Sequence, residues 1–269
     1  FNPGLATRFR VTESLLSIAA TYGIEPENIP QHYLRTLPTN VIKKRASPVT
    51  QHGRRVNGRV MPVVRSDEHE SLARDVKVIN RYLDKQHLEN AVFSGYYRSF
   101  NMGDEPSFNW DKGGRLYSPG KDSYQKLKKE QRLSTMRINH EPVAEVDINA
   151  SYLSIFYGMN GCPLPAKEDL YKVPGLHRGI VKAWINSAFG KGALPTRWPS
   201  EAKAELIANG ICMDKLTMTK VGSRICTAIP ILKLLATSKI TWADLMYLES
   251  CAIISAMDSL RENFNIPAY

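Results

Sequence analysis

A predicted helix in the second half of this 269-residue chain combines two cations, an amide and an aromatic ring. At about 100° per residue, one narrow sector of that helix holds four side chains: Arg178, Lys182, Asn186 and Phe189. The opposite side is apolar and suits a protein core, and Gly190 suits the helix end. Two cations one turn apart match a polyphosphate, and a flat ring further along matches a nucleobase. An ordinary amphipathic surface helix has the same pattern, so the spacing alone leaves both interpretations open.

A second segment places two carboxylates just before a turn. Residues 143–148 alternate apolar and acidic side chains, as a short strand does, so Glu145 and Asp147 are expected on one side. A helix is expected to follow from Tyr152. A carboxylate at the end of a strand is well placed to hold a divalent cation, because such ions take oxygen ligands. A solvated strand face or a helix cap would explain the same residues.

Together the two segments resemble motifs of template-directed nucleic-acid polymerases. Asp147 followed five residues later by Tyr152 resembles motif A of DNA polymerases, with the Tyr that family B enzymes have there. The run from Lys182 through Asn186 to Phe189 is similar to motif B of family B, with Phe in place of the usual Tyr.

The order of the elements is closer to family A. The sequence Gly-Gly-Arg-Leu-Tyr around Arg115, followed by Gln125, resembles the family A segment that contacts primer and template and precedes motif A. With Arg132 included, residues 75–269 resemble small family A-related polymerases of phages and mobile elements. The resemblance implies an α+β fold: a polymerase-like palm sheet, mainly helical fingers and a reduced or absent thumb.

The resemblance also implies a reaction. A DNA polymerase of this kind transfers nucleotides from dNTPs to a primer 3′ end by a two-metal mechanism, with Asp147 and the carbonyl of Ile148 holding Mg²⁺ or Mn²⁺. Arg178 and Lys182 are expected to bind the triphosphate. Lys182 is also expected to protonate the leaving pyrophosphate. Tyr152 is expected to exclude ribonucleotides. The remaining expected contacts are with the nascent base pair (Asn186 and Phe189) and with the primer–template backbone (Arg115, Gln125 and Arg132).

The second catalytic carboxylate, in motif C, is not found in the sequence, although two metals about 4 Å apart need more than one Asp. The carboxylates of Asp244, Glu249 and Asp258 lie in a predicted helix, where capping or solvated roles are expected. Motif C is therefore expected beyond Tyr269. Two alternatives remain: a catalytically inactive, polymerase-like protein that binds nucleic acid, and an RNA polymerase or primase of the same palm type, which Tyr152 disfavours.

Charge and composition agree with a nucleic-acid partner. The net charge is +10 and the isoelectric point is near 9.4. Residues 43–65 carry Lys and Arg without any Asp or Glu, and residues 112–137 are also strongly basic. Clustered cations predict contact with a phosphate backbone, here a DNA primer–template. No apolar run is long enough for a membrane span, so a cytoplasmic protein with reduced thiols is expected, and its oligomeric state is left open.

The chain is expected to divide into residues 1–66, an N-terminal helix with a basic arm or linker, and residues 67–269, the palm and fingers. A helix is expected at residues 11–22 and another at residues 67–90, where Leu, Val and Ile recur at helical spacing. No metal-ligand spacing with Cys or acidic residues is seen for four of the histidines: His52, His69, His87 and His140.

Overall fold

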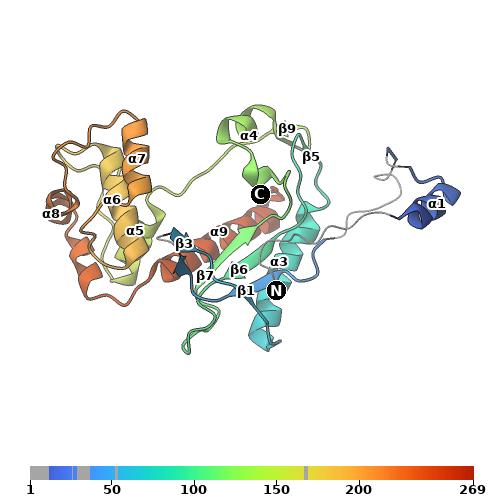
Figure 1. Cartoon of the computed structure of the whole chain (residues 1–269), viewed down its shortest axis with the longest axis horizontal. Helices are drawn as coiled ribbons and strands as arrows, with labels where there is room; N and C mark the ends of the chain where they lie inside the picture. The colour runs from blue at the N-terminus through green and yellow to red at the C-terminus, as the bar shows by residue number, and fades with distance from the viewer. Residues whose placement is uncertain (1–11, 26, 29–36, 52–53, 167–168) are drawn as a thin grey trace. The chain divides into compact units, whose positions relative to one another are not determined.

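The computed structural model describes residues 12–25, 27–28, 37–51, 54–166 and 169–269 (Figure 1). The chain forms two compact units, residues 1–37 and residues 38–269. The first contains α1 (Glu13–Thr21), whose N-terminus is capped by the Thr12 side chain. This helix confirms the one expected at residues 11–22. Most of the expected linker before residue 37 lies outside the described residues.

The larger unit is built around a mixed four-stranded sheet with the order β4-β1-β6-β7. Its strands are β1 (Ile42–Arg45), β4 (Val60–Met61), β6 (Tyr97–Phe100) and β7 (Gly113–Tyr117). The first strand, β1, runs parallel to β6 and antiparallel to β4, and β6 pairs antiparallel with β7. Because β1 and β4 belong to this sheet, the division falls after Leu37, and residues 38–66 are part of the folded unit instead of a linker.

Helix α3 (Asp67–Leu83) packs against the sheet as its periodicity predicts. The Ser66 side chain caps the N-terminus of α3 by accepting from the N–H of His69. Val76, Ile79 and Leu83 are buried along one side of the helix. The buried Asn80 donates to the carbonyl of Tyr96 at 2.9 Å and accepts from its N–H at 2.6 Å. This pair of hydrogen bonds fixes the helix to the residue just before β6. The helix ends at Leu83, seven residues before the expected end.

Two smaller sheets complete the strand content of the described residues. They are a hairpin, β2 (Val49–Gln51) with β3 (Arg54–Val56), and a three-stranded sheet, β5 (Leu88–Glu89), β8 (Arg137–Ile138) and β9 (Glu141–Pro142). Between β7 and β8 lie a 3₁₀ turn, η1 (Tyr124–Lys126), and α4 (Lys129–Thr135).

The prediction of a strand at residues 143–148 is wrong, because no strand forms there. Beyond Pro142 the chain has no strand pairing up to α5, and the Val146 side chain is 92% exposed. An extended segment becomes a strand only when a neighbour takes up its backbone hydrogen bonds, and no described strand lies beside this one. The alternating pattern of the sequence could not supply that neighbour.

The second half of the chain is helical. Its elements are α5 (Ser151–Met159), α6 (Arg178–Lys191), α7 (Ser200–Ala208), α8 (Met218–Ala228), the 3₁₀ segment η2 (Pro230–Ala236) and α9 (Trp242–Phe264). Trp184 of α6 is buried at the centre and donates to the carbonyl of Met218 at 3.0 Å. Gly222 leaves room for this ring, since an added Cβ would lie 2.7 Å from it.

Helix α9 joins two hydrophobic cores. Leu245, near its start, belongs to the helical core formed with α5, α6 and α8, whereas Ile254 and Met257 belong to the core between the sheet and α3. In between, the Ser250 hydroxyl donates to the carbonyl of Gly114 on β7 at 2.5 Å. The molecule is therefore an α+β protein in which one long helix crosses from the sheet to the helical region (Figure 1). Among the described helices, none has both the length and the apolar character that a membrane span requires.

Candidate functional site

A pocket of about 620 Å³ collects most of the residues that the sequence predicts as a site. We call it the α5–α6 pocket. Its lining comprises Arg115, residues 147–152, Tyr171, Arg178, Lys182, Asn186, Gly190, Trp242 and Glu249. This volume lies within the usual range for small-molecule sites. Segments of β7, α5, α6 and α9 thus meet at one cavity.

Helix α6 forms one wall of the pocket. Arg178, Lys182 and Asn186 are exposed and line the cavity at successive turns, as the helical spacing predicts. Arg178 is held by Asp169, with its Nε 2.7 Å from the carboxylate, and this hydrogen bond lowers the pKa of Asp169. Lys182 and Asn186 have no polar partner among the described residues. The wall therefore presents one cation and one amide that are available to a ligand.

The end of α6 differs from the expectation. The Phe189 side chain is only 1% exposed, so its predicted place on the exposed sector is wrong. It packs edge-to-face on Tyr152 and on Phe156 of α5, with ring centroids 6.2 and 5.4 Å apart. The helix also continues past Gly190 to Lys191, and Gly192 closes it at a φ of 67°.

The segment after β9 brings Asp147 to the pocket. Asp147, Ile148 and Asn149 are exposed and line the cavity, and the Asn149 side chain accepts a 3.5 Å hydrogen bond from Arg178. Helix α5 begins directly afterwards, with Ala150 in the left-handed region at a φ of 51° and no side chain capping its N-terminus. The Asp147 carboxylate and the first turn of α5 thus face the same space.

Strand β7 and helix α9 form the opposite wall. Arg115 makes an ion pair with Glu249, to which both its Nε and its Nη2 donate, and its Nη2 also lies 3.3 Å from the Tyr152 hydroxyl. The other Glu249 oxygen accepts from the Ser151 hydroxyl. Burial lowers the pKa of Arg115, but hydrogen bonding to Glu249 together with the electrostatic effects of Tyr152, Glu249 and Tyr117 outweighs it, and the net pKa is raised. For Tyr152, burial has the opposite effect and raises the pKa, so its hydroxyl stays neutral near pH 7.

Glu249 is the site residue that the sequence analysis missed. A capping or solvated role was expected for it, but its side chain is only 17% exposed and lines the pocket. Asp244 and Asp258, the other two carboxylates considered in the sequence, have local partners on α9 instead. Asp244 completes the capping box with Thr241, and Asp258 pairs with Arg261 at 3.0 Å. No local pattern distinguishes Glu249 from them, because its partners come from β7 and α5.

Three other predicted residues lie outside the pocket. Arg132 pairs with Glu145 at 2.8 Å, and Lys129 lies 3.5 Å from the same carboxylate, so Glu145 does not join Asp147. The Gln125 side chain accepts from the N–H of Ser118 at 2.9 Å and lines a smaller, neighbouring cavity that shares Arg115 and Glu249 with the α5–α6 pocket. Arg132 and Gln125 therefore hold their own part of the chain together.

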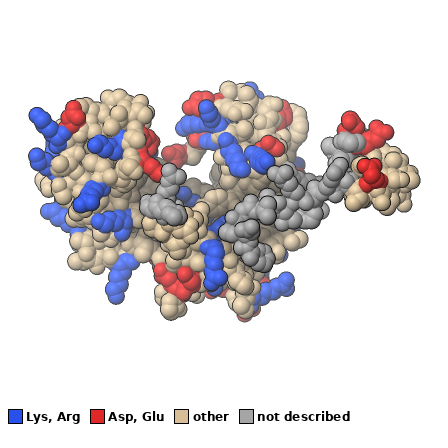
Figure 2. Space-filling view, in the orientation of Figure 1, with Lys and Arg blue, Asp and Glu red and all other residues tan. Residues whose placement is uncertain are grey.

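A second, larger hollow of about 740 Å³ lies between β1, β4 and the exposed side of α3. Five basic residues and one acid, Glu70, line it; the basic ones are Lys43, Arg65, Arg74, Lys77 and Arg81. Figure 2 shows further Lys and Arg side chains over the helical region of α6, α7 and α8, with few Asp and Glu among them. Of these basic residues, only Lys43 and Arg65 of the hollow belong to the clusters predicted at residues 43–65 and 112–137.

Comparisons with protein-family models, with curated proteins and with solved structures find no match for this chain.

Proposed function

We propose that the chain is a template-directed DNA polymerase or part of one, and that the α5–α6 pocket binds the incoming nucleotide. A single observation carries the proposal. Six residues named from motif spacing, spread over 72 positions from Arg115 to Asn186, line one cavity together with Ile148. They are Arg115, Asp147, Tyr152, Arg178, Lys182 and Asn186.

The two walls suit the two ends of a deoxynucleoside triphosphate. Arg178 and Lys182, one turn apart on α6, would bind the phosphates through charge-assisted hydrogen bonds. Tyr152 would lie near the sugar and disfavour a 2′-hydroxyl, since its ring is held between Arg115 and Phe189. Positioning and charge stabilisation are the main contributions that a protein makes to phosphoryl transfer.

The pocket contains oxygen donors that fit a hard divalent cation. The exposed Asp147 carboxylate has no ion-pair partner among the described residues, and the Ile148 carbonyl belongs to the same lining segment. Mg²⁺ is usually held by one or two carboxylates together with substrate phosphates. When bound there it would neutralise the triphosphate and lower the pKa of the primer hydroxyl. Glu249 is the other carboxylate of the lining, and Arg115 and Ser151 already occupy its two oxygens.

Primer extension tests the proposal. We expect the protein with its natural C-terminus to extend a DNA primer on a template in Mg²⁺, and to use deoxynucleotides in preference to ribonucleotides. Asp147→Ala should reduce turnover at least about 1000-fold while leaving DNA affinity nearly unchanged. Asp258→Ala removes an α9 carboxylate that does not line the pocket, and it should keep full turnover.

The alternative of a polymerase-like binding protein predicts another result. Such a protein would show salt-dependent DNA binding but no extension, and Asp147→Ala would change neither. Extension with ribonucleotides alone would favour an RNA polymerase or primase instead.

A further inference from the structure

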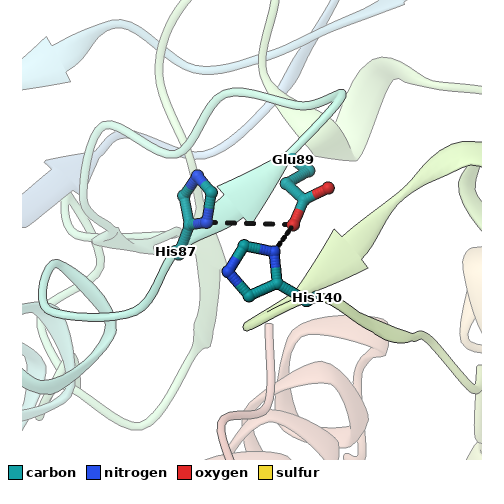
Figure 3. Close-up of side chains that lie close together, drawn as sticks. All are labelled: His87, Glu89 and His140. Carbon is teal, nitrogen blue, oxygen red and sulfur yellow. Dashed lines mark ion pairs between the residues drawn. The ribbon is translucent and has the colours of Figure 1, made fainter.

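Two histidines and a glutamate, none of which lines the α5–α6 pocket, meet on the small three-stranded sheet (Figure 3). His87 lies directly before β5, and Glu89 is the last residue of that strand, so the i and i+2 side chains share a face. The Glu89 Oε1 atom is 3.8 Å from the Nδ1 atom of His87 and 2.6 Å from that of His140. The three ligand atoms all lie within 4.8 Å of one another.

His140 reaches this cluster from the hairpin between β8 and β9. The two-residue turn, Asn139 and His140, has φ values of 51° and 71°, which is the combination of a type I′ turn. Asn suits the first position, but the second is usually Gly. His140 therefore occupies a backbone position that favours another residue. A side chain retained there despite the strain is a reason to look for a function.

Two hydrogen bonds join His87 to Asn139, the residue before His140. The N–H of His87 donates to the Asn139 side-chain oxygen at 2.9 Å, and the N–H of Asn139 donates to the His87 carbonyl at 2.8 Å. The imidazole centroids are 4.9 Å apart and the rings are tilted by 67°, so they meet edge to face. The cluster is thus built by the sheet pairing and does not depend on long flexible side chains.

The Glu89 Oε1 atom is buried and lacks a hydrogen-bond donor of suitable geometry among the described residues, although His140 is close. A buried carboxylate oxygen needs a donor or a positive partner, which here is either a protonated imidazole of the cluster or a bound cation. Two imidazole nitrogens and a carboxylate oxygen are a ligand set that Zn²⁺ and similar ions take in proteins. Bonds of about 2.0–2.2 Å in a tetrahedral site place ligand atoms about 3.3–3.5 Å apart, which small side-chain rotations would reach here.

We propose that His87, Glu89 and His140 bind a divalent transition metal, with Zn²⁺ as the expected ion and solvent completing the coordination. The exposed imidazoles, 62% and 76% accessible, leave a path for the ion and room for water. A bound ion would join β5 to the β8–β9 hairpin and stabilise the small sheet. This site is separate from the oxygen-lined α5–α6 pocket, and the proposal does not depend on the proposed function.

Calorimetry and thermal unfolding of the untagged full chain with Zn²⁺ test the proposal. We expect binding of one ion per chain and a rise in melting temperature of about 5 °C or more at a hundredfold excess over the dissociation constant. Mg²⁺ at the same concentration should not reproduce the shift. His140→Gly is the decisive variant, because it removes a ligand while suiting the turn.

In His140→Gly the metal-free protein should melt at or above the wild-type temperature, while Zn²⁺ affinity falls at least about tenfold and the zinc-induced shift is lost. Glu89→Gln should have the same effect on zinc binding. His177→Asn is the matched control, because it removes an exposed imidazole elsewhere and keeps a side chain that can cap α6. Equal zinc shifts in wild type and His140→Gly, or no binding to the wild type, would overturn the assignment.

Discussion

The two walls of the α5–α6 pocket differ in how their charges are paired. On the wall of β7 and α9, Arg115 and Glu249 neutralise each other and are tied further to Tyr152 and Ser151. On the α6 wall, Lys182 and Asn186 have no polar partner among the described residues, and Arg178 pairs with an acid from outside the helix. The first wall is thus held by its own interactions, whereas the second keeps donors open to the cavity.

This difference assigns separate tasks to the walls. A half-buried ion pair that also binds two neighbouring hydroxyls positions the side chains around it, because each group restricts the others. An unpaired cation contributes little to folding, but it can bind an anionic ligand without first breaking a contact. We therefore expect substitutions on the α6 wall to change activity and those on the α9 wall to change stability as well.

Lys182→Ala should give the largest effect of the remaining substitutions. Removing the unpaired cation takes away a charge-assisted contact to the triphosphate, so we expect kcat/KM for deoxynucleotides to fall about 100-fold or more. The free energy of unfolding should change by less than about 0.5 kcal/mol, since the side chain is exposed and unpaired. Steady-state primer extension and urea unfolding of the same preparation give both values.

Lys191→Ala is the control, because Lys191 is the last residue of α6 and lies outside the pocket lining, so kcat/KM should not change. An equal loss in this variant would mean that the loss comes from the change in net charge and not from a contact in the pocket.

Glu249→Gln tests the paired wall. The variant keeps the size of the side chain but removes its charge from Arg115 and from the Ser151 hydroxyl. Because Arg115 is 42% exposed and can regain water, we expect a loss of about 1–2 kcal/mol in the free energy of unfolding. Urea denaturation measures it.

Glu262→Gln is the control on the same helix. Glu262 pairs with Arg261, and the Glu262 side chain is 62% exposed. It should cost less than about 0.5 kcal/mol. Equal losses in the two variants would show that the pocket wall is no more tightly held than the surface of α9.

The sequence predicted which side of α6 carries the polar side chains, but it did not predict which of the predicted residues are buried. Helical spacing placed Arg178, Lys182 and Asn186 correctly on the pocket side. It placed Phe189 there as well, but α5 lies over the last turn of α6 and buries that ring. Periodicity gives the orientation of a side chain about its own helix, whereas burial depends on an element from elsewhere in the chain.

Contacts between distant segments explain the other differences. Arg115 and Glu249 are 134 residues apart, and no spacing rule links them. His87 and Glu89 have the i, i+2 spacing that puts two ligands on one strand face, a signal that could have been recognised in the sequence. Only the pairing of β5 with β8 brings His140 beside them. The α+β class was expected from the resemblance to polymerases, whereas the helix at residues 67–90 and the start of α5 were expected from local sequence.

Asp244→Asn sharpens the comparison by its dependence on pH. Asp244 caps α9 and pairs with Lys112, next to the paired wall. Burial raises the pKa of Asp244, but the hydrogen bonds from Lys112 and Thr241 and the positive charge of Lys112 together outweigh it, and the net pKa is lowered. A carboxyl group whose pKa is lower in the folded state stabilises the protein above its unfolded pKa, about 3.9, and loses this contribution as the pH falls through the folded value.

Asn keeps the cap and removes the charge, so the variant should be less stable by about 0.5–1 kcal/mol at pH 7, and the difference should shrink below about pH 4. Urea unfolding from pH 3 to pH 7 measures it, and a difference that stays constant over that range would show that the cap, and not the ion pair, accounts for the loss.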